Sequence, residues 1–533
     1  MPMRPVLPLL LLSLSQCGPP RGASAREPAR GGTAVIGVRA DVGTFNLYTA
    51  STAFAQEIAD LLFLQLARER PELQDGRPAF GPELAESWEA GDDGLSITFH
   101  LRRDVAWSDG VPTTARDVRY SWQIARDAEV AFLNADVKQQ IEDVQVLDDY
   151  TVRFRFARRY PYQLMDAVDG SVYPRHVLEP VPVAEWRSTD WSRRLVYNGP
   201  FRLEEWKRND SFTLVRNPTH HDPAVPRLDR IVFRVVPDPD ALLTQFLAGE
   251  VDVMADLPPR GLERVRRSGA HRVVEYPDRY FQYLCWNSRR PWFAQPEVRR
   301  ALSLGIDMDA ILDALLYGTA RRARSPLISP FAEHDGALEP FPYRPEVARR
   351  ILARNGWTDS DGDSWLDRGG VPFAFELETN VGDSVREDAA VMIQEQLRRI
   401  GIEVRPRLVE MSVFQRKHLD KDFDAFMAAW RVSTKPDYLE TLFHSESPFN
   451  YPSYSDPRLD QLVREAPFVT NFQAALPLWR EAQAILHRDQ PYTLMYERQA
   501  AHGVSLRLQG VRMDHLGPYA YVKEWWLPAG SER

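Results

Sequence analysis

The chain has 533 residues, which is too long for a single hydrophobic core and predicts several domains. With 66 Lys and Arg against 75 Asp and Glu, the net charge of −9 excludes the basic footprint of a nucleic-acid-binding protein. The content of 44% hydrophobic and 26% charged residues is typical of a globular protein. Its two cysteines, Cys17 and Cys285, lie in unrelated contexts, so no structural disulfide is expected.

The chain begins with a short apolar run that ends close to a cysteine. Val6–Leu14 is too short to span a bilayer and is typical of the core of a secretion signal. The string LSQC, ending at Cys17, resembles a bacterial lipobox, whose cysteine is acylated and becomes the first mature residue; Gln16 stands where a small residue is usual. We therefore expect a lipoprotein signal peptide over residues 1–16 and a flexible tether over residues 17–30. The alternative is a plain secretory signal with an incidental cysteine.

The first clear elements are a strand and a capped helix. Leu95–Leu101 has apolar residues at every second position, which predicts a half-buried strand. Trp107–Val118, WSDGVPTTARDV, then forms a turn and starts a helix. Thr113 or Thr114 can cap this helix, and Asp117, three residues after Thr114, completes a variant of the capping box. The stretch is therefore a structural junction without catalytic character.

Strand and helix signals alternate along the rest of the chain. Asp238–Met254 predicts a helix followed by a strand, with Pro239 near the helix start and Gly249 past its end. Ser384–Ile400 predicts a helix between two strands, as in a βαβ unit. Phe423–Trp430 predicts a buried strand. The expected fold class is α/β with several sheets.

The sequence lacks the strings that mark common enzymes. It contains no G-x-S-x-G, no P-loop, no H-E-x-x-H and no C-x-x-C. We therefore expect neither an enzymatic activity nor a cofactor.

Two stretches raise the question of a metal ion. Asp359–Gly370, DSDGDSWLDRGG, resembles a calcium loop, but Ser364 and Gly370 stand where an EF-hand needs Gly and Glu. A solvated acidic turn is the preferred interpretation, with calcium as the alternative. His220 and His221 are adjacent, and adjacent side chains on an extended chain point in different directions. No metal site is therefore expected.

Several segments, in order, carry a resemblance to a known family. They are FHLRRDVAWSDGVPTTARDVRYSW (Phe99–Trp122), YNGPFRLEEW (Tyr197–Trp206), FLAGEVDV (Phe246–Val253) and YPSYSDPRLDQLVREA (Tyr451–Ala466). In these segments the chain resembles the family 5 extracellular solute-binding proteins. These proteins are the oligopeptide- and dipeptide-binding components of ABC importers.

The resemblance implies an α/β fold of two hinged lobes, the type II periplasmic-binding-protein clamp, with an extra domain on the first lobe. Lobe I would comprise residues 31–75, 196–280 and 503–533. The extra α/β domain would comprise residues 76–195, and lobe II residues 281–502. The chain would cross between the lobes twice, and a ligand cleft would lie between them.

The same resemblance implies a function. The protein would be an extracytoplasmic lipoprotein that captures a peptide or peptide-like solute and delivers it to an ABC importer. Its partners would be the permease and ATPase subunits in the membrane. It would act as a monomer, anchored by its lipid to the membrane, in the periplasm or at the cell surface. One alternative is a ligand-sensing receptor subunit on the same fold. Another is a binder of a non-peptide solute, such as a metal chelate, a sugar or an anionic small molecule.

Candidate ligand contacts follow from the resemblance. The loop Thr44–Glu57 corresponds to one that lines the cleft in the family, so Ser51 and Thr52 are ligand contacts, helix caps or both. Trp430 ends a predicted strand and is either a ligand contact or a core residue. In peptide-binding relatives a segment like W-x-A-D-Y occurs here, and its Asp pairs with the peptide's α-amino group. Counted from Trp430, that position is Ser433 in this chain.

The charges around Ser433 differ from those of peptide binders. Its neighbours Arg431 and Lys435 are cationic, and Asp437 is the nearest acid. Burying a cationic amino group without a carboxylate is costly. We therefore predict that a neutral or anionic solute, or an N-blocked peptide, binds better than a free peptide held by its amino terminus. The alternative is that Arg431 and Lys435 face solvent while Asp437 pairs with the amino group.

Overall fold

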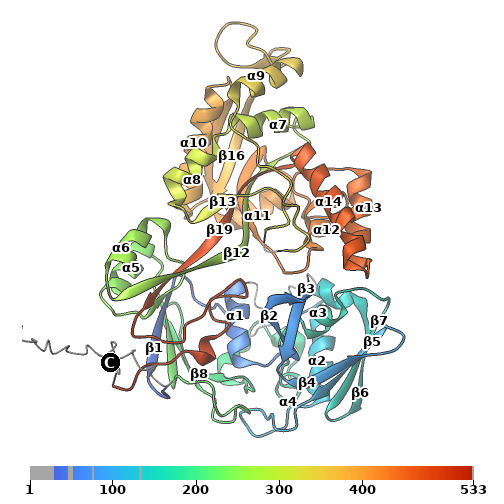
Figure 1. Ribbon diagram of the computed structural model, residues 1–533, viewed down its shortest axis with the longest axis vertical. Helices are drawn as coiled ribbons and strands as arrows, with labels where there is room; N and C mark the ends of the chain where they lie inside the picture. Colours follow the sequence, from blue (N-terminus) through green and yellow to red (C-terminus); the bar gives the residue numbers. More distant parts are fainter. Residues whose placement is uncertain are drawn as a thin grey trace, which may run out of the picture.

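In the computed structural model, which describes residues 29–45, 52–74, 77–130, 132, 135–329 and 331–530, one mixed sheet runs through both lobes (Figure 1). Its strand order is β17-β16-β18-β12-β19-β11-β1-β10-β9-β8, and β13 pairs with β19 beside this path. The strands are β1 (Thr33–Val38), β8 (Phe201–Lys207), β9 (Ser211–Arg216), β10 (Arg230–Val235), β11 (Val253–Met254), β12 (His271–Trp286), β13 (Ala320–Arg322), β16 (Ala374–Asn380), β17 (Glu403–Val409), β18 (Ala425–Arg431) and β19 (Tyr492–Ser505).

Two long strands form the connection between the lobes. β12 has 16 residues and β19 has 14, and they pair antiparallel along nearly their whole length. The pairing is interrupted between Pro277 and Phe281, where three residues of β12 have no partner in the register. Such an irregularity bends a strand locally, and here it lies where the chain passes from one lobe to the other. We refer to this crossing as the hinge.

Lobe I has a sheet with a hydrophobic core on each face. Ala34 and Ile36 of β1 belong to the larger core, while Val35 belongs to the smaller core on the other face. The helices of this lobe are α1 (Ala53–Leu62), α5 (Pro239–Leu247) and α6 (Leu262–Arg267), with the short 3-10 helices η4 (Pro259–Gly261) and η6 (Val522–Glu524).

The extra domain is built on a separate four-stranded antiparallel sheet, β4-β5-β7-β6, beside a β2–β3 hairpin. Its core begins at Leu64, earlier in the chain than residue 76, while Trp107 and Trp186 pack in the larger core of lobe I. The elements are β2 (Ala67–Gln74), β3 (Arg77–Pro82), β4 (Ala85–Ala90), β5 (Ser96–Leu101), β6 (Ile141–Asp148), β7 (Thr151–Phe156), α2 (Ala115–Ala125), α3 (Gln163–Val168), α4 (Arg175–Leu178), η1 (Ala135–Gln140), η2 (Val183–Glu185) and η3 (Trp191–Arg193).

Lobe II covers both faces of its part of the sheet with helices. Along β12, Leu284 and Trp286 face one core and Tyr283 and Cys285 the other, which explains why the sequence of this strand is continuously apolar. The elements are α7 (Pro296–Gly305), α8 (Met308–Leu316), α9 (Pro345–Arg354) and α10 (Ser384–Arg398) on the first face; α11 (Met411–Leu419), α12 (Tyr438–Phe443), α13 (Pro457–Glu465), η5 (Ala466–Phe468) and α14 (Phe472–Asp489) on the second; and a β14 (Asp367–Arg368) and β15 (Val371–Pro372) hairpin.

The local predictions from the sequence are confirmed at the junction Trp107–Val118. The backbone N–H of Thr114 donates to Asp117 Oδ2 at 2.8 Å, as a capping box requires, and α2 starts at the next residue. Cys285 is fully buried in β12, and burial raises the pKa of its thiol, which makes it an inert core residue.

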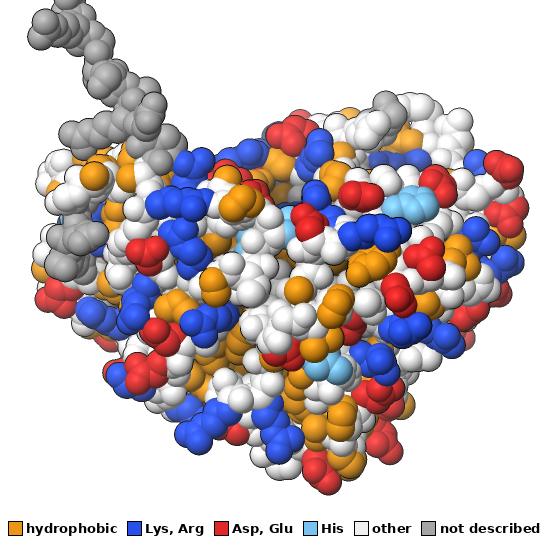
Figure 2. All heavy atoms as spheres, turned by 90° about the horizontal axis from the view of Figure 1, so that it is seen from below, with side chains coloured by type: hydrophobic (Ala, Val, Ile, Leu, Met, Phe, Trp, Pro, Cys, Tyr) orange, Lys and Arg blue, Asp and Glu red, His pale blue; other side chains and the backbone are white. Residues whose placement is uncertain are grey.

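Two surface features bear on partners. The face seen in Figure 2, formed by lobe I and the extra domain, carries Lys and Arg interspersed with Asp and Glu, so the net negative charge is not concentrated there. Within the part of the chain that the structure describes, none of the helices has the length and apolar character needed to cross a membrane.

Gly199 packs against the end of α1, where its backbone N–H donates to the carbonyl oxygen of Leu62 at 2.9 Å. A Cβ at this position would lie 2.5 Å from the carbonyl carbon of Leu62, a backbone atom that cannot move independently. We expect Gly199→Ala to lower the free energy of unfolding by about 1–3 kcal/mol, measured by thermal or urea denaturation. The matched control is Gly336→Ala, since nothing lies within 4 Å of a Cβ there. Equal stability of the two variants would contradict the close packing.

Candidate functional site between the lobes

The last residue of β18 and the residues that follow it connect lobe II to the opposite side of the cleft. We call residues 431–437 the interlobe segment. Arg431 Nη1 lies 2.9 Å from Glu57 Oε1 on α1. Thr434 Oγ1 donates to Glu69 Oε2 on β2 at 3.0 Å, and Lys435 Nζ lies 3.1 Å from Asp166 Oδ1 on α3. The segment therefore contacts lobe I and the extra domain at three points, and the lobes are closed upon each other.

The contact made by Lys435 is the most deeply buried of the three. The side chain of Lys435 is 10% exposed and that of Asp166 is 1% exposed. Asp437 Oδ2 lies 2.7 Å from Lys435 Nζ, and Tyr160 Oη donates to Asp166 Oδ2 at 2.6 Å. Burial alone would lower the pKa of Lys435, but attraction to Asp437 and Asp166 outweighs it and holds the pKa above its usual value. Lys435 is therefore a buried ammonium group shared by two carboxylates.

A cavity of about 270 Å³ lies on the hinge side of the interlobe segment. We call it the hinge cavity, and its wall includes Phe54, Glu57, Tyr276, Arg431, Arg498 and His502. Both lobes contribute to this wall, because Glu57 comes from α1 while Arg431 ends β18. A solute held there would contact both lobes at once.

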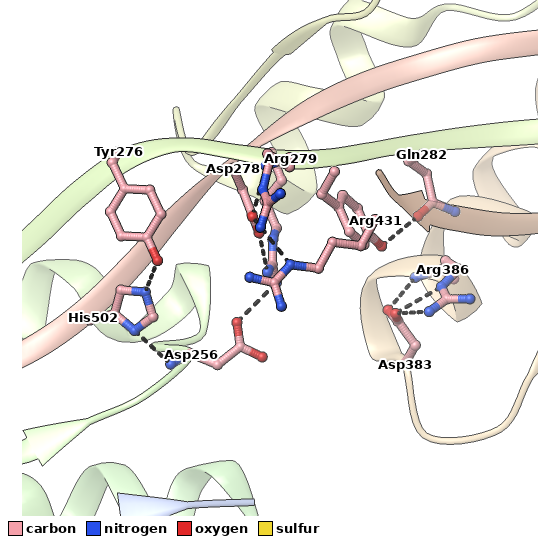
Figure 3. Close-up of polar contacts among 11 residues, drawn as sticks. Asp256, Tyr276, Asp278, Arg279, Gln282, Asp383, Arg386, Arg431 and His502 are labelled. Atoms are coloured by element: carbon pink, nitrogen blue, oxygen red, sulfur yellow. Dashed lines mark hydrogen bonds and ion pairs between the residues drawn. The ribbon is translucent and has the colours of Figure 1, made fainter. Parts of the chain in front are cut away.

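Arg431 and Arg498 of the hinge cavity lie beside acidic side chains (Figure 3). Arg498 lies between two acids, with Nη1 2.9 Å from Asp256 Oδ1 and Nη2 2.7 Å from Asp278 Oδ2. Arg431 Nε lies 3.9 Å from Asp278 Oδ1. Burial alone would raise the pKa of Asp278, but Arg498 and Arg431 outweigh it, so its pKa lies below the usual value. Asp278 is therefore ionised at neutral pH.

Neutral polar groups continue this network. His502 Nδ1 accepts the backbone N–H of Asp256 at 3.2 Å, and His502 Nε2 lies 3.1 Å from Tyr276 Oη (Figure 3). The two rings stack, with centroids 5.5 Å apart and an angle of 17° between their planes. Burial lowers the pKa of His502 to about 4, so the imidazole is neutral near pH 7.

A larger cavity, of about 880 Å³, lies on the other side of the interlobe segment. We call it the outer cavity, and its wall includes Arg158 and Tyr160 from the extra domain and Lys435, Asp437 and His444 from lobe II. Its volume lies in the range of known small-molecule sites, about 300–1,000 Å³. The interlobe segment thus separates two spaces, with Arg431 in the wall of one and Lys435 and Asp437 in the wall of the other.

The remaining residues predicted from the sequence lie at the edge of this arrangement. Ser51 lies outside the described residues. Thr52 Oγ1 accepts the backbone N–H of Ala55 at 3.2 Å, so its role as the cap of α1 is confirmed, and a ligand contact stays a prediction. Trp430 stacks on Tyr283 and Tyr451, with ring centroids 6.4 and 5.8 Å away, on the lobe II side. Its role as a ligand contact also stays a prediction.

The charge pattern around Ser433 is corrected by the structure. Lys435 does not face solvent, as the sequence-based alternative assumed, but is buried against Asp166 and Asp437. Arg431 is compensated by Glu57. Ser433 is exposed, and its hydroxyl donates to the carbonyl oxygen of Lys435 at 2.9 Å. The positive charge that the local sequence indicates is therefore balanced by Glu57 and Asp166 across the cleft and by Asp437 within the interlobe segment.

The two candidate metal stretches lie away from these cavities. The rings of His220 and His221 are 4.5 Å apart at 62°, and burial lowers the pKa of His220 to about 4. Asp359, Asp361 and Asp363 are exposed, and one carboxylate oxygen of each lies within 4.8 Å of those of the other two. The carboxylate of Asp359 accepts backbone N–H groups of its own turn, at 2.7 and 3.1 Å, as a solvated acidic turn requires. Calcium binding at this loop, the alternative interpretation from the sequence, stays a prediction.

The buried contact of Lys435 generates a testable prediction about closure. Lys435→Met would leave Asp166 without its cation in the closed form, which costs about 3–5 kcal/mol for a buried pair. We therefore expect small-angle scattering of the ligand-free variant to show a larger radius of gyration than the wild type. Arg458→Met is the control, because its partner Glu481 is 43% exposed and lies on the surface of lobe II. An unchanged radius for Lys435→Met would show that this ion pair does not hold the lobes together.

Comparisons with known proteins agree with this architecture. The model of the bacterial extracellular solute-binding proteins, family 5 (middle region), matches residues 79–450. The oligopeptide-binding protein AppA of Bacillus subtilis is 28% identical over 98% of each chain, and the heme-binding protein A of Haemophilus influenzae is 25% identical over 84% of this chain and 85% of that protein. The solved structure of the Bacillus subtilis AppA in complex with a nonapeptide has a TM-score of 0.82 and 27% identity, covering 94% of this chain and 100% of that one. The expected two-lobed α/β clamp is thereby confirmed, and the chain belongs to family 5 of the bacterial extracellular solute-binding proteins.

Proposed function

We propose that this protein captures a peptide or peptide-like solute between its two lobes and delivers it to the membrane permease of an ABC importer. The observation that carries the proposal is the interlobe segment, which closes on lobe I and the extra domain between two cavities. In such a clamp, a solute that contacts both lobes favours the closed form, because it binds that form better than the open one. The protein would carry out no reaction, and ATP hydrolysis would belong to the partner subunits.

Two observations support an inference about the class of solute. The similarity to AppA, described as an oligopeptide-binding protein and solved with a nonapeptide, supports a peptide. The exposed Ser433, which stands where peptide binders have an acid, supports a ligand without a free amino group at that point. A blocked or acidic peptide satisfies both, and a non-peptide solute is the second candidate, since a relative is described as heme-binding.

The solute class is tested first by mass spectrometry of small molecules retained during native purification. Calorimetry then compares a pool of di- to pentapeptides with its N-acetylated counterpart. We expect the acetylated pool to bind at least as tightly as the free one, and Ser433→Asp to reverse that order. A saturating peptide, at 100 times its Kd, should raise the free energy of unfolding by about 2.7 kcal/mol.

Two outcomes would contradict the proposal in different ways. Tight binding of free-amino peptides that is lost in Asp437→Asn would replace the predicted role of Ser433 by an ammonium site at Asp437. Binding without any increase in compactness, measured by scattering on the Lys435→Met variant with and without saturating peptide, would exclude capture by hinge closure.

We also propose that the protein is anchored to the membrane by a lipid on Cys17. Residues 1–28 lie outside the described part of the structure, so this proposal is supported by the sequence of the apolar run and its cysteine. The first described strand, β1, begins at Thr33, and a tether of residues 17–30 would leave the lobes free to move beside a permease.

The anchor is tested by fractionation. In cells, we expect the wild type in the membrane fraction and Cys17→Ser in the soluble fraction, because one acyl-cysteine group supplies the attachment. Gln16→Ala is the matched control. Its signal peptide should be cleaved at least as completely as that of the wild type, because a small residue is usual before the cysteine. A wild type that is wholly soluble would contradict the lipoprotein assignment and leave the secretory alternative.

A further inference from the structure

The direction of the hydrogen bonds at His502 is fixed by a backbone group. The main-chain N–H of Asp256 can only donate, so His502 Nδ1, 3.2 Å away, must offer its lone pair. A neutral imidazole has one hydrogen, and it therefore lies on Nε2. Protonation at Nδ1 would break the bond to Asp256, so the arrangement requires the neutral ring.

The same reasoning sets the direction of the next bond. His502 Nε2 donates its hydrogen to Tyr276 Oη, 3.1 Å away, and the hydroxyl oxygen is the acceptor. The hydrogen of the tyrosine hydroxyl is then left for another acceptor. Within the described ranges of the chain, Tyr276 Oη has no hydrogen-bond partner other than His502. Both residues line the hinge cavity, so its wall presents an O–H donor.

The hinge cavity also holds cationic donors beside its acids. The carboxylates of Glu57, Asp256 and Asp278 each form an ion pair with Arg431 or Arg498. Arg498 Nε is buried without a hydrogen-bond partner among the described residues. Arg39, also in the wall, is exposed and forms no ion pair with a described residue. An oxygen acceptor placed beside Tyr276 would therefore meet the O–H hydrogen of Tyr276 and, near it, the N–H groups of Arg498 and Arg39.

We propose that Tyr276 is a specificity-determining residue, which donates its hydroxyl hydrogen to an acceptor oxygen of the solute, a carboxylate or a carbonyl, placed in the hinge cavity. The inference rests on the proposed capture of a solute between the lobes. The hinge cavity then receives the oxygen-bearing end of the solute, and Arg498 and Arg39 favour a carboxylate there. His502 acts as a positioning residue, since it turns the hydroxyl without contacting the solute.

The first test needs no ligand. Nitrogen-15 NMR of the full chain, labelled at histidine, reports which ring nitrogen carries the hydrogen, and His502→Gln assigns the signals. At pH 7 we expect a neutral ring with the hydrogen on Nε2. A hydrogen on Nδ1, or a charged imidazolium, would overturn the inference, because Tyr276 would then have to donate to His502 or lose its partner.

The second test measures the consequence for binding. The probes are an N-acetylated tripeptide pool with free carboxylates and the same pool with C-terminal amides, titrated into the wild type and Tyr276→Phe. We expect Tyr276→Phe to weaken the carboxylate pool about 10- to 100-fold, as for a hydrogen bond to a charged group. Tyr521→Phe, whose hydroxyl donates to Asp514 outside both cavities, should bind like the wild type.

Each outcome decides a different point. Equal loss for both pools would place a carbonyl oxygen at Tyr276, and loss for the carboxylate pool alone would place a carboxylate there. Unchanged binding of both pools by Tyr276→Phe would overturn the inference. If the wild type binds neither pool, the proposal that the solute is a peptide has failed. The inference about Tyr276 is then decided by the tautomer of His502 and by the chemistry of the solute retained on purification. A retained solute that lacks a carboxylate or carbonyl would then overturn it.

Discussion

The antiparallel pairing of β12 with β19 is the constraint on which the rest of the molecule depends. These two strands are the middle of a sheet shared by both lobes, so each lobe completes its own sheet on one half of the same pair. Backbone hydrogen bonds fix the register on either side of the crossing, and the irregularity after Pro277 concentrates bending there. The lobes can therefore move as units about a short region. A side chain or solute beside that region contacts both of them.

The surfaces that meet when the lobes close are rich in charge. Removing an ion from water costs several kcal/mol, which a partner must offset. Lys435 is offset by Asp166 and Asp437, and Arg431 by Glu57 and Asp278. Because Asp166 and Glu57 lie across the cleft from Lys435 and Arg431, these two ion pairs exist only in the closed form. Closure is therefore coupled to charge pairing, and a charged solute in the cleft would compete with these pairs or extend them.

Hydrogen-bond direction adds a second level of selectivity to the charges. A backbone N–H cannot change its role, so Asp256 determines the tautomer of His502 and, through it, the free hydrogen of Tyr276. The stacked rings hold this geometry within the hinge cavity. The O–H donor of Tyr276 favours an oxygen acceptor over an ammonium group, because an unmatched donor in a buried wall is costly.

The sequence by itself determined the α/β class, the capped helix after Trp107 and, through its resemblance, the family and the clamp, because these depend on local periodicity and on ordered motifs. It also located the interlobe segment by the departure at Ser433. It did not reveal that Lys435 is buried, nor that Glu57, Asp166, Tyr276, Arg498 and His502 meet it or each other across the cleft. Apart from Arg498 and His502, those five residues lie more than 100 positions apart, and their burial and partners follow from how the long strands bring the lobes together. Only the tertiary structure could decide them, because a charge pair or a tautomer is fixed by distance in space and not by spacing along the chain.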